Sequence, residues 1–246
     1  MKPWETLGQA RTPDGATMTL ARSGSEHVIR VDGQHLMSSR MHGSEDALAA
    51  LACGRARLLP QPAVLVGGLG MGFTLRATLD LLPPGASVLV VELLAAVVVW
   101  NRSLLGELAG HPLADPRVSV EVADVGAVMR ASAGRFDAIL LDVDNGPSAF
   151  TSWENDGLYD AQGLAAARAA LAPGGALAVW SAKDDRRFQQ RLREAGFSVE
   201  VTRVRGHMNK GPRHVIFVGH QAVEVRSTTG DQDITRITGD QKTRRV

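Results

Sequence analysis

Three glycines spaced two residues apart are the sharpest chemical signal in the sequence. Gly68, Gly70 and Gly72 follow an apolar run that begins at Val64, and the segment after them has the pattern of a helix. Glycine permits a sharp turn and a close approach of the backbone to a ligand, and the first N–H groups of a helix can bind an anionic or polar group. The plainer alternative is that the glycines only let a strand meet a helix.

Acidic residues follow the next two apolar runs. Glu92 ends the run that starts at Val88, at about the distance from the turn where a carboxylate can accept both hydroxyls of a ribose. Asp124 follows Val118–Val122 and is placed to accept a hydrogen bond from an adenine amine, although it would also make a good helix N-cap. The third glycine comes one residue earlier than in the dinucleotide fingerprint, which favours a nucleoside without a pyrophosphate over NAD.

A second polar cluster follows the apolar run Ala138–Leu141. Asp142, Asp144 and Asn145 stand where a parallel strand would end, the usual place for ligands in open α/β sheets. Two acids this close together can raise the pKa of one of them and make it a base, so both are candidate catalytic residues and Asn145 is a candidate substrate ligand. The same segment is also ordinary turn sequence. Tyr159 is a candidate wall of the acceptor pocket, with core packing as its alternative.

Several other chemistries have no residues to carry them. No two of the seven histidines stand at i and i+4 around a carboxylate, and Cys53 is the single cysteine, so we expect no metal. The sequence also lacks a Gly-x-Ser-x-Gly elbow and a Gly-Lys-Ser/Thr after the glycines, which excludes the usual serine hydrolase and P-loop sites. A lone cysteine cannot form an internal disulfide, so a cytoplasmic, reducing location is expected.

The charge balance is nearly even. The 246 residues include 27 Lys and Arg against 26 Asp and Glu, a net charge of +1, which gives no field to attract nucleic acid or an anionic membrane. No apolar run approaches the ~20 residues that a membrane-spanning helix needs. We therefore expect neither nucleic acid nor membrane as a partner, and a small molecule as the acceptor in the predicted site.

The apolar runs themselves predict the elements that position these residues. Runs that are apolar on both faces, separated by segments long enough for crossover helices, are typical of a doubly wound, mostly parallel α/β sheet. Two further segments read as an antiparallel hairpin that closes the sheet. The parallel strands are expected at Val64–Val66, Val88–Val91, Val118–Val122, Ala138–Leu141 and Ala176–Trp180, and the hairpin at Phe197–Val204 and His214–Gly219.

The two ends of the chain differ from this pattern. Residues 1–45 alternate apolar and polar positions in Met18–Arg22 and His27–Asp32, which predicts a small β region whose unpaired edges offer a surface for a homodimer. A helix over Glu45–Leu59 should lead into a nucleoside-binding catalytic domain at 46–220. Residues 221–246 are polar and are expected to form a disordered tail.

Taken together, these features resemble the class I S-adenosylmethionine-dependent transferases and, among them, the spermidine synthase family of polyamine aminopropyltransferases. The likeness extends from about Thr17 to Val218. It rests on Asp32-Gly33, Gly67–Arg76, Val91-Glu92, Ala123-Asp124, Phe136–Asp142, Leu158-Tyr159 and Leu171–Gly175. The resemblance implies a seven-stranded Rossmann-like methyltransferase sheet and S-adenosylmethionine, or its decarboxylated form, as the cofactor.

The resemblance also assigns roles to individual residues. Gly68, Gly70 and Gly72 would lie against the methionine portion of the cofactor, Glu92 would hold the ribose, and Asp124 would meet the adenine. Asp142 matches the acid that serves the attacking amine. Glu45 and Asp46 stand where the family has a Tyr-Gln/His pair that helps to bind the substrate.

Departures from the family pattern affect the expected reaction. Met71 replaces an acid between the last two glycines, and Asn145 replaces the second acid of the Asp-x-x-Asp loop, with Asp144 displaced by one position. A buried ammonium without a carboxylate is costly, so a diamine would be poorly held. We therefore expect methyl transfer to a small polar acceptor. Aminopropyl transfer to an amine is the close alternative, and a non-catalytic nucleoside-binding relative is the third.

Overall fold

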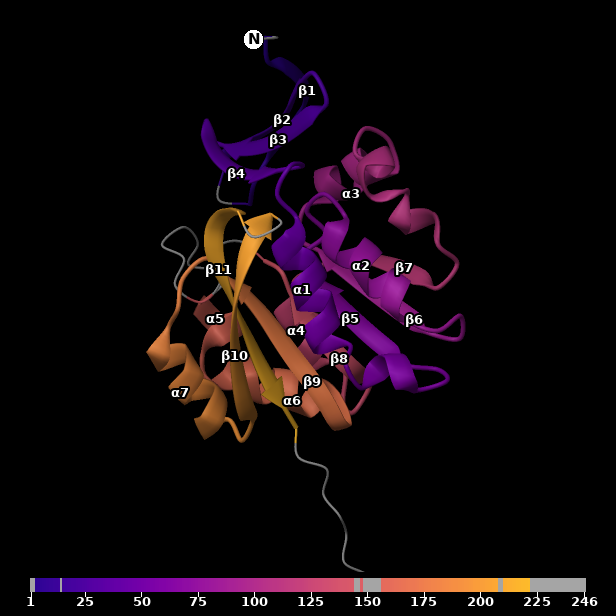
Figure 1. Cartoon of the computed structure of the whole chain (residues 1–246), viewed down its shortest axis with the longest axis vertical. Coiled ribbons are helices and arrows are strands. Elements are labelled where there is room, and N and C mark those ends of the chain that lie inside the picture. Colours follow the sequence, from indigo (N-terminus) through magenta and orange to yellow (C-terminus); the bar gives the residue numbers. More distant parts are fainter. Residues whose placement is uncertain (1–2, 14, 144–146, 148–155, 208–209, 222–246) are drawn as a thin grey trace, which may run out of the picture.

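Two β-sheets organise the computed structural model, which describes residues 3–13, 15–143, 147, 156–207 and 210–221 (Figure 1). The smaller sheet is antiparallel and joins four consecutive strands: β1 (Glu5–Arg11), β2 (Thr17–Ser23), β3 (Glu26–Val31) and β4 (Gln34–Ser38). The sequence predicted the two central strands of this sheet. Its edge strands β1 and β4 were not predicted, because neither has the clear alternation of β2 and β3.

The larger sheet has seven strands in the order β10-β11-β9-β8-β5-β6-β7. Strands β5 to β9 run parallel, and β11 lies antiparallel between β9 and β10. This confirms the predicted doubly wound sheet with its closing hairpin. The strands are β5 (Ala63–Gly67), β6 (Ser87–Glu92), β7 (Val118–Val122), β8 (Phe136–Leu141), β9 (Leu171–Ser181), β10 (Ser198–His207) and β11 (Lys210–His220).

Helices cover both faces of the larger sheet (Figure 1). One face carries α1 (Gly43–Ala52), α2 (Phe73–Leu81) and α3 (Ala95–Arg102), and the other carries α4 (Val125–Arg130), α5 (Asp156–Tyr159), α6 (Ala161–Ala170) and α7 (Arg186–Glu194). Short 3-10 turns lie at Ala56–Leu58, Gly106–Ala109 and Pro112–Ala114. None of the described helices is both long and apolar enough to cross a membrane.

The helix expected over Glu45–Leu59 is shorter than predicted. It begins two residues earlier, at Gly43, and ends at Ala52, where the N–H of Cys53 still bonds to the carbonyl of Ala49. A separate 3-10 turn then occupies Ala56–Leu58. Gly54 interrupts the helical pattern between the two, since glycine weakens a helix interior.

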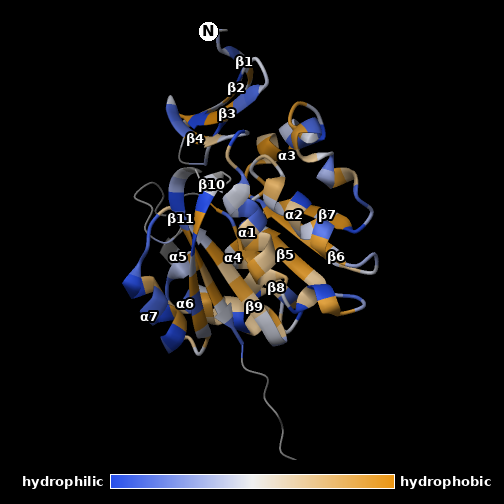
Figure 2. Ribbon diagram, viewed as in Figure 1, coloured by the Kyte–Doolittle hydropathy of each residue, from blue (hydrophilic) through white to orange (hydrophobic). Residues whose placement is uncertain are grey.

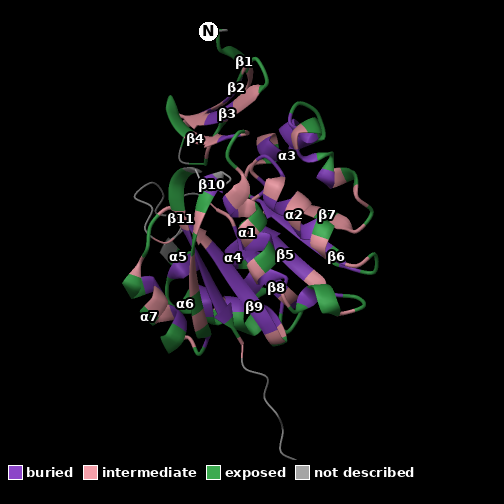
Figure 3. Cartoon of the chain, viewed as in Figure 1, coloured by how far each residue is buried: buried purple, intermediate pink, exposed green. Residues whose placement is uncertain are grey.

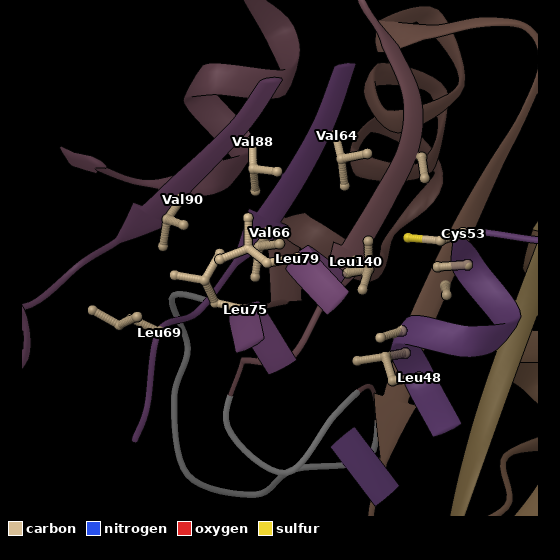
Figure 4. Packing of buried hydrophobic residues seen from close by; sticks show 14 of the residues in the cluster. Leu48, Cys53, Val64, Val66, Leu69, Leu75, Leu79, Val88, Val90 and Leu140 are labelled. Atoms are coloured by element: carbon tan, nitrogen blue, oxygen red, sulfur yellow. The ribbon is translucent and has the colours of Figure 1, made fainter. Parts of the chain in front are cut away.

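The core consists of two hydrophobic clusters on opposite faces of the larger sheet, whose strands are mostly apolar and buried (Figures 2 and 3). Figure 4 shows Leu75 and Leu79 of α2 beside Val66 of β5, with Leu48 of α1 and Cys53, the residue after this helix, on the other side of Leu140. Burial raises the pKa of the Cys53 thiol to about 12, so this thiol remains protonated and serves as a small apolar group.

Candidate functional site

The predicted site lies where the direction of the sheet connections reverses. From β5 the chain crosses to β6 and β7 on one side, and it returns to β8 on the other side of β5. At this point the N–H of Asp142 donates to the carbonyl of Gly67 at 2.9 Å, and the N–H of Gly68 donates to Val91 at 2.9 Å. The glycine turn and the end of β8 are therefore adjacent, at the position where open α/β sheets bind ligands.

The glycine turn needs its glycines for its own conformation. Gly68, Gly70 and Gly72 have φ values of 89°, 51° and 85°, in the left-handed region that other residues rarely adopt. A Cβ at Gly68 would also overlap the carbonyl oxygen of Asp142, and one at Gly70 would lie 3.3 Å from the sulfur of Met37. The turn is therefore closely packed between the end of β8 and the smaller sheet, and its role toward a cofactor stays a prediction.

Glu92 braces the turn from the end of β6. Its side chain is only 8% exposed. One carboxylate oxygen accepts from the N–H of Leu69 and the other from the N–H of Leu94, both at 2.9 Å. These bonds fix the carboxylate beside the turn. Each oxygen can accept more than one hydrogen bond, so the contact with a ribose is compatible with them and stays a prediction.

Asp124 caps the helix that follows β7. Its carboxylate accepts from the N–H groups of Gly126 at 2.9 Å and Ala127 at 3.1 Å, and Arg130 lies 3.3 Å away. Its side chain remains 58% exposed. The N–H of Ala123 donates to the carbonyl of Glu92, so the two acids predicted to bind the nucleoside stand at neighbouring strand ends. The N-cap that the sequence allowed is present, and the adenine contact stays a prediction.

Asp142 is held by a hydroxyl group from the helix after the glycine turn. The Oγ1 of Thr74 donates to its Oδ2 at 2.5 Å. Burial raises the pKa of the Asp142 carboxyl above its ordinary value, and the hydrogen bond from Thr74 opposes that shift. The side chain is therefore a carboxyl group that binds a proton more readily than an exposed aspartate, as a catalytic base requires.

Glu45, in the first turn of α1, completes a pair of acids with Asp142. Burial, followed by the charge of Asp142, raises the pKa of Glu45 to about 7, and a bond of 2.6 Å from the Ser44 hydroxyl opposes the shift. In the part of the chain that the structure describes, neither carboxyl has an ion-pair partner. The side chain of the neighbouring Asp46 is 60% exposed and lies 3.7 Å from His42, and its role toward a substrate stays a prediction.

The structure places Tyr159 in the core. Its side chain is 4% exposed and packs edge-on against Phe188, with ring centroids 5.6 Å apart, in the cluster on the α6 and α7 face. That face is opposite to the one that carries α1 and α2; the packing agrees with the core alternative, and the contact with an acceptor stays a prediction. Asp144 and Asn145 lie outside the described residues, and their predicted roles are untested.

Two residues beside the site were not predicted from the sequence. Thr74 contacts Asp142, as described above. Asn101, which is 2% exposed, donates from its amide to the carbonyl of Gly70 at 2.8 Å and to that of Val97 at 2.9 Å. A buried amide at the end of an apolar helix was the available signal, because such a group must find hydrogen-bond partners. Among the described residues, no three His, Cys, Asp or Glu side chains gather where they could hold a metal ion.

Strand order and the glycine turn define the Rossmann-like methyltransferase fold, and solved structures of spermidine synthases share it. The enzyme from Thermotoga maritima aligns over 89% of this chain and 73% of its own, at 16% identity and a TM-score of 0.67. A spermidine synthase in complex with the transition state analogue AdoDATO gives the same coverage and TM-score at 17% identity. A probable spermidine synthase from Corynebacterium glutamicum covers 89% and 81%, at 18% identity and a TM-score of 0.62.

These similarities concern the fold. No protein-family model matches the sequence, and no curated protein matches it either. At 16–18% identity the chain shares a spermidine synthase-like fold, and a shared fold does not specify the chemistry of the site.

Proposed function

We propose that this chain is a transferase that moves an alkyl group from the sulfonium of S-adenosylmethionine, or of its decarboxylated form, to a small amine. The observation that carries the proposal is the pair of partly buried carboxyl groups, Glu45 and Asp142, beside the glycine turn. Two carboxylates that lie close enough for their charges to interact repel each other when no cation lies between them, which makes their ionised forms unfavourable. An ammonium group between them would relieve the repulsion, so a cationic acceptor suits this site.

The residues around the turn suit a nucleoside cofactor. Glu92 and Asp124 present carboxylates at neighbouring strand ends, and glycine at three positions of the turn lets the backbone approach a ligand closely. A cofactor bound there would supply a carbon activated by positive sulfur. The chain would then align the acceptor amine, exclude water, and take a proton from the ammonium onto the acid pair, so that the nitrogen lone pair becomes available.

Met71 favours methyl transfer over aminopropyl transfer. It is 3% exposed and apolar, at the position in the turn where the spermidine synthase pattern has an acid. Without a carboxylate there, the ammonium of an aminopropyl group would lack a partner. Aminopropyl transfer remains the second candidate, because the solved structures that share the fold are spermidine synthases, one of them in complex with AdoDATO.

Product analysis with both cofactors and a panel of small amines tests the proposal. Adenosylhomocysteine together with a methylated amine is the expected result. Methylthioadenosine from the decarboxylated cofactor would select the second candidate. Asp142→Asn should lose the activity while binding the cofactor, whereas Asp80→Asn, which alters an exposed acid on α2, should retain it. A wild-type protein that binds either cofactor and forms neither product would show a non-catalytic nucleoside-binding protein.

A further inference from the structure

Two buried hydroxyl groups each occupy one oxygen of the acid pair. Thr74, 2% exposed, donates to Oδ2 of Asp142 at 2.5 Å, and Ser44, 3% exposed, donates to Oε2 of Glu45 at 2.6 Å. A hydroxyl has one hydrogen to donate, so each hydroxyl serves one carboxyl. The structure gives Oδ1 of Asp142 and Oε1 of Glu45 no side-chain donor among the described residues.

Both hydroxyls are held by the elements that frame the site. Thr74 lies in the first turn of α2, two residues after the left-handed Gly72. Ser44 lies in the first turn of α1. Both helices pack on the same face of the sheet. A hydrogen bond to a carboxylate stabilises its ionised form, so each hydroxyl favours ionisation of its carboxyl while leaving the second oxygen available.

We propose that Thr74 and Ser44 are positioning residues that keep the Glu45–Asp142 pair ionised and direct one oxygen of each carboxyl toward the ammonium of the acceptor. The proposal rests on the proposed function. In the step that it serves, an N–H bond of the ammonium breaks and its proton moves to a carboxylate. The nitrogen lone pair then forms the new N–C bond, while the C–S bond breaks and its electron pair remains on sulfur.

The pH dependence follows from the groups around the pair. The charges that act on Glu45 are those of Asp142 and, more weakly, Asp46, and both raise its pKa, as burial does. Burial also raises the pKa of Asp142. Only the two hydroxyl bonds and a backbone hydrogen bond to Glu45 act in the opposite direction. Removing a hydroxyl therefore keeps its carboxyl protonated to higher pH.

The test compares Thr74→Val, Thr74→Ser and Ser44→Ala with Thr78→Val, which removes a buried hydroxyl one turn later on α2 without contacting either acid. Carboxyl ¹³C NMR of the ligand-free protein should show Asp142 titrating at higher pH in Thr74→Val, and Glu45 at higher pH in Ser44→Ala. Thr74→Ser and Thr78→Val should titrate like wild type. Thermal unfolding checks that each variant is folded.

Kinetics supply the second readout. In Thr74→Val, kcat/KM for the acceptor should fall about ten-fold near neutral pH, the effect of one hydrogen bond to a charged group, and the acid limb of its pH profile should move to higher pH. Serine should restore both. Unchanged carboxyl titrations in folded Thr74→Val and Ser44→Ala would overturn the positioning role. If wild type formed no product with either cofactor, the proposed function would fail, while the NMR titrations would still decide the role of the hydroxyls.

Discussion

Glu45 illustrates how a residue that suits a reaction can destabilise the folded protein. A carboxyl that ionises at about pH 7 in the folded protein is more favourable as the neutral acid, so its charge weakens the folded state at alkaline pH. Nothing in the packing of α1 requires an acid there, since the helix is held by Leu48, Ala49 and Ala52. The residue is therefore better explained by a ligand than by stability.

Glu45→Gln should raise the free energy of unfolding at pH 8. An unfolded glutamate ionises near pH 4.5 and the folded one near pH 7, so the folded state binds more protons between these values, and stability is lost as the pH rises through them. We expect a gain of about 1–3 kcal/mol at pH 8 that fades below pH 4.5, measured by urea unfolding at both pH values. The exposed Glu107→Gln is the control, and an equal gain there would contradict the prediction.

The sequence reached this pair only in part. Asp142 was predicted because it follows a strand, and Glu45 because of its place in the family pattern. Asp46 was predicted together with Glu45, but consecutive residues of a helix point about 100° apart, and the Asp46 side chain is 60% exposed whereas Glu45 is partly buried. Thr74 carried no signal of its own, since a threonine after a glycine turn becomes informative only when the strand beside it is known.

At the scale of elements, the glycine turn depends on groups from two neighbouring segments. Glu92 holds the N–H of Leu69 from the end of β6, and Asn101 of α3 holds the carbonyl of Gly70. These bonds fix the backbone that the cofactor is proposed to contact. Binding a ligand to a turn that is already fixed costs less conformational entropy than binding it to a turn that must first become ordered.

Glu92→Ala should therefore weaken cofactor binding by about 1–3 kcal/mol, a rise in Kd of about five- to 150-fold. It removes the predicted acceptor of the ribose hydroxyls and also leaves two backbone N–H groups without their carboxylate. Calorimetric titration with S-adenosylmethionine measures the effect. Glu121→Ala removes an exposed acid from the adjacent strand β7 and should bind like wild type. An unchanged Kd in Glu92→Ala would remove this residue from the site.

The sequence predicted the central elements more accurately than the peripheral ones. The five parallel runs fall within β5 to β9. Four of these strands are largely buried and have continuously apolar runs, as strands covered on both faces require, whereas the edge strand β7 is less buried and alternates apolar and polar residues. The beginning of β9 at Leu171 was missed because Pro173 and two glycines there read as a loop. Strands β1 and β4 were missed because edge strands of an exposed sheet need little apolar alternation.

At the scale of the whole molecule, the smaller sheet shares a hydrophobic cluster with the larger domain. Met18, Leu20 and Ile29 belong to the cluster that covers the α1, α2 and α3 face of the larger sheet. The contact is close: a Cβ on Gly8 of β1 would lie 2.6 Å from the indole nitrogen of Trp100 on α3. A shared core favours joint unfolding, although the sequence had predicted a separate β region at residues 1–45.

Leu20→Ala tests whether the two parts unfold together. Leu20 is fully buried on β2, and its truncation should lower the free energy of unfolding by about 2–5 kcal/mol. If the shared cluster couples the sheets, amide hydrogen exchange should accelerate by the same factor in β2, β3, β5 and β8. Thr19→Ala, on the other face of β2, should change all four much less. Faster exchange confined to β2 and β3 would mean that residues 1–45 form an independently unfolding unit.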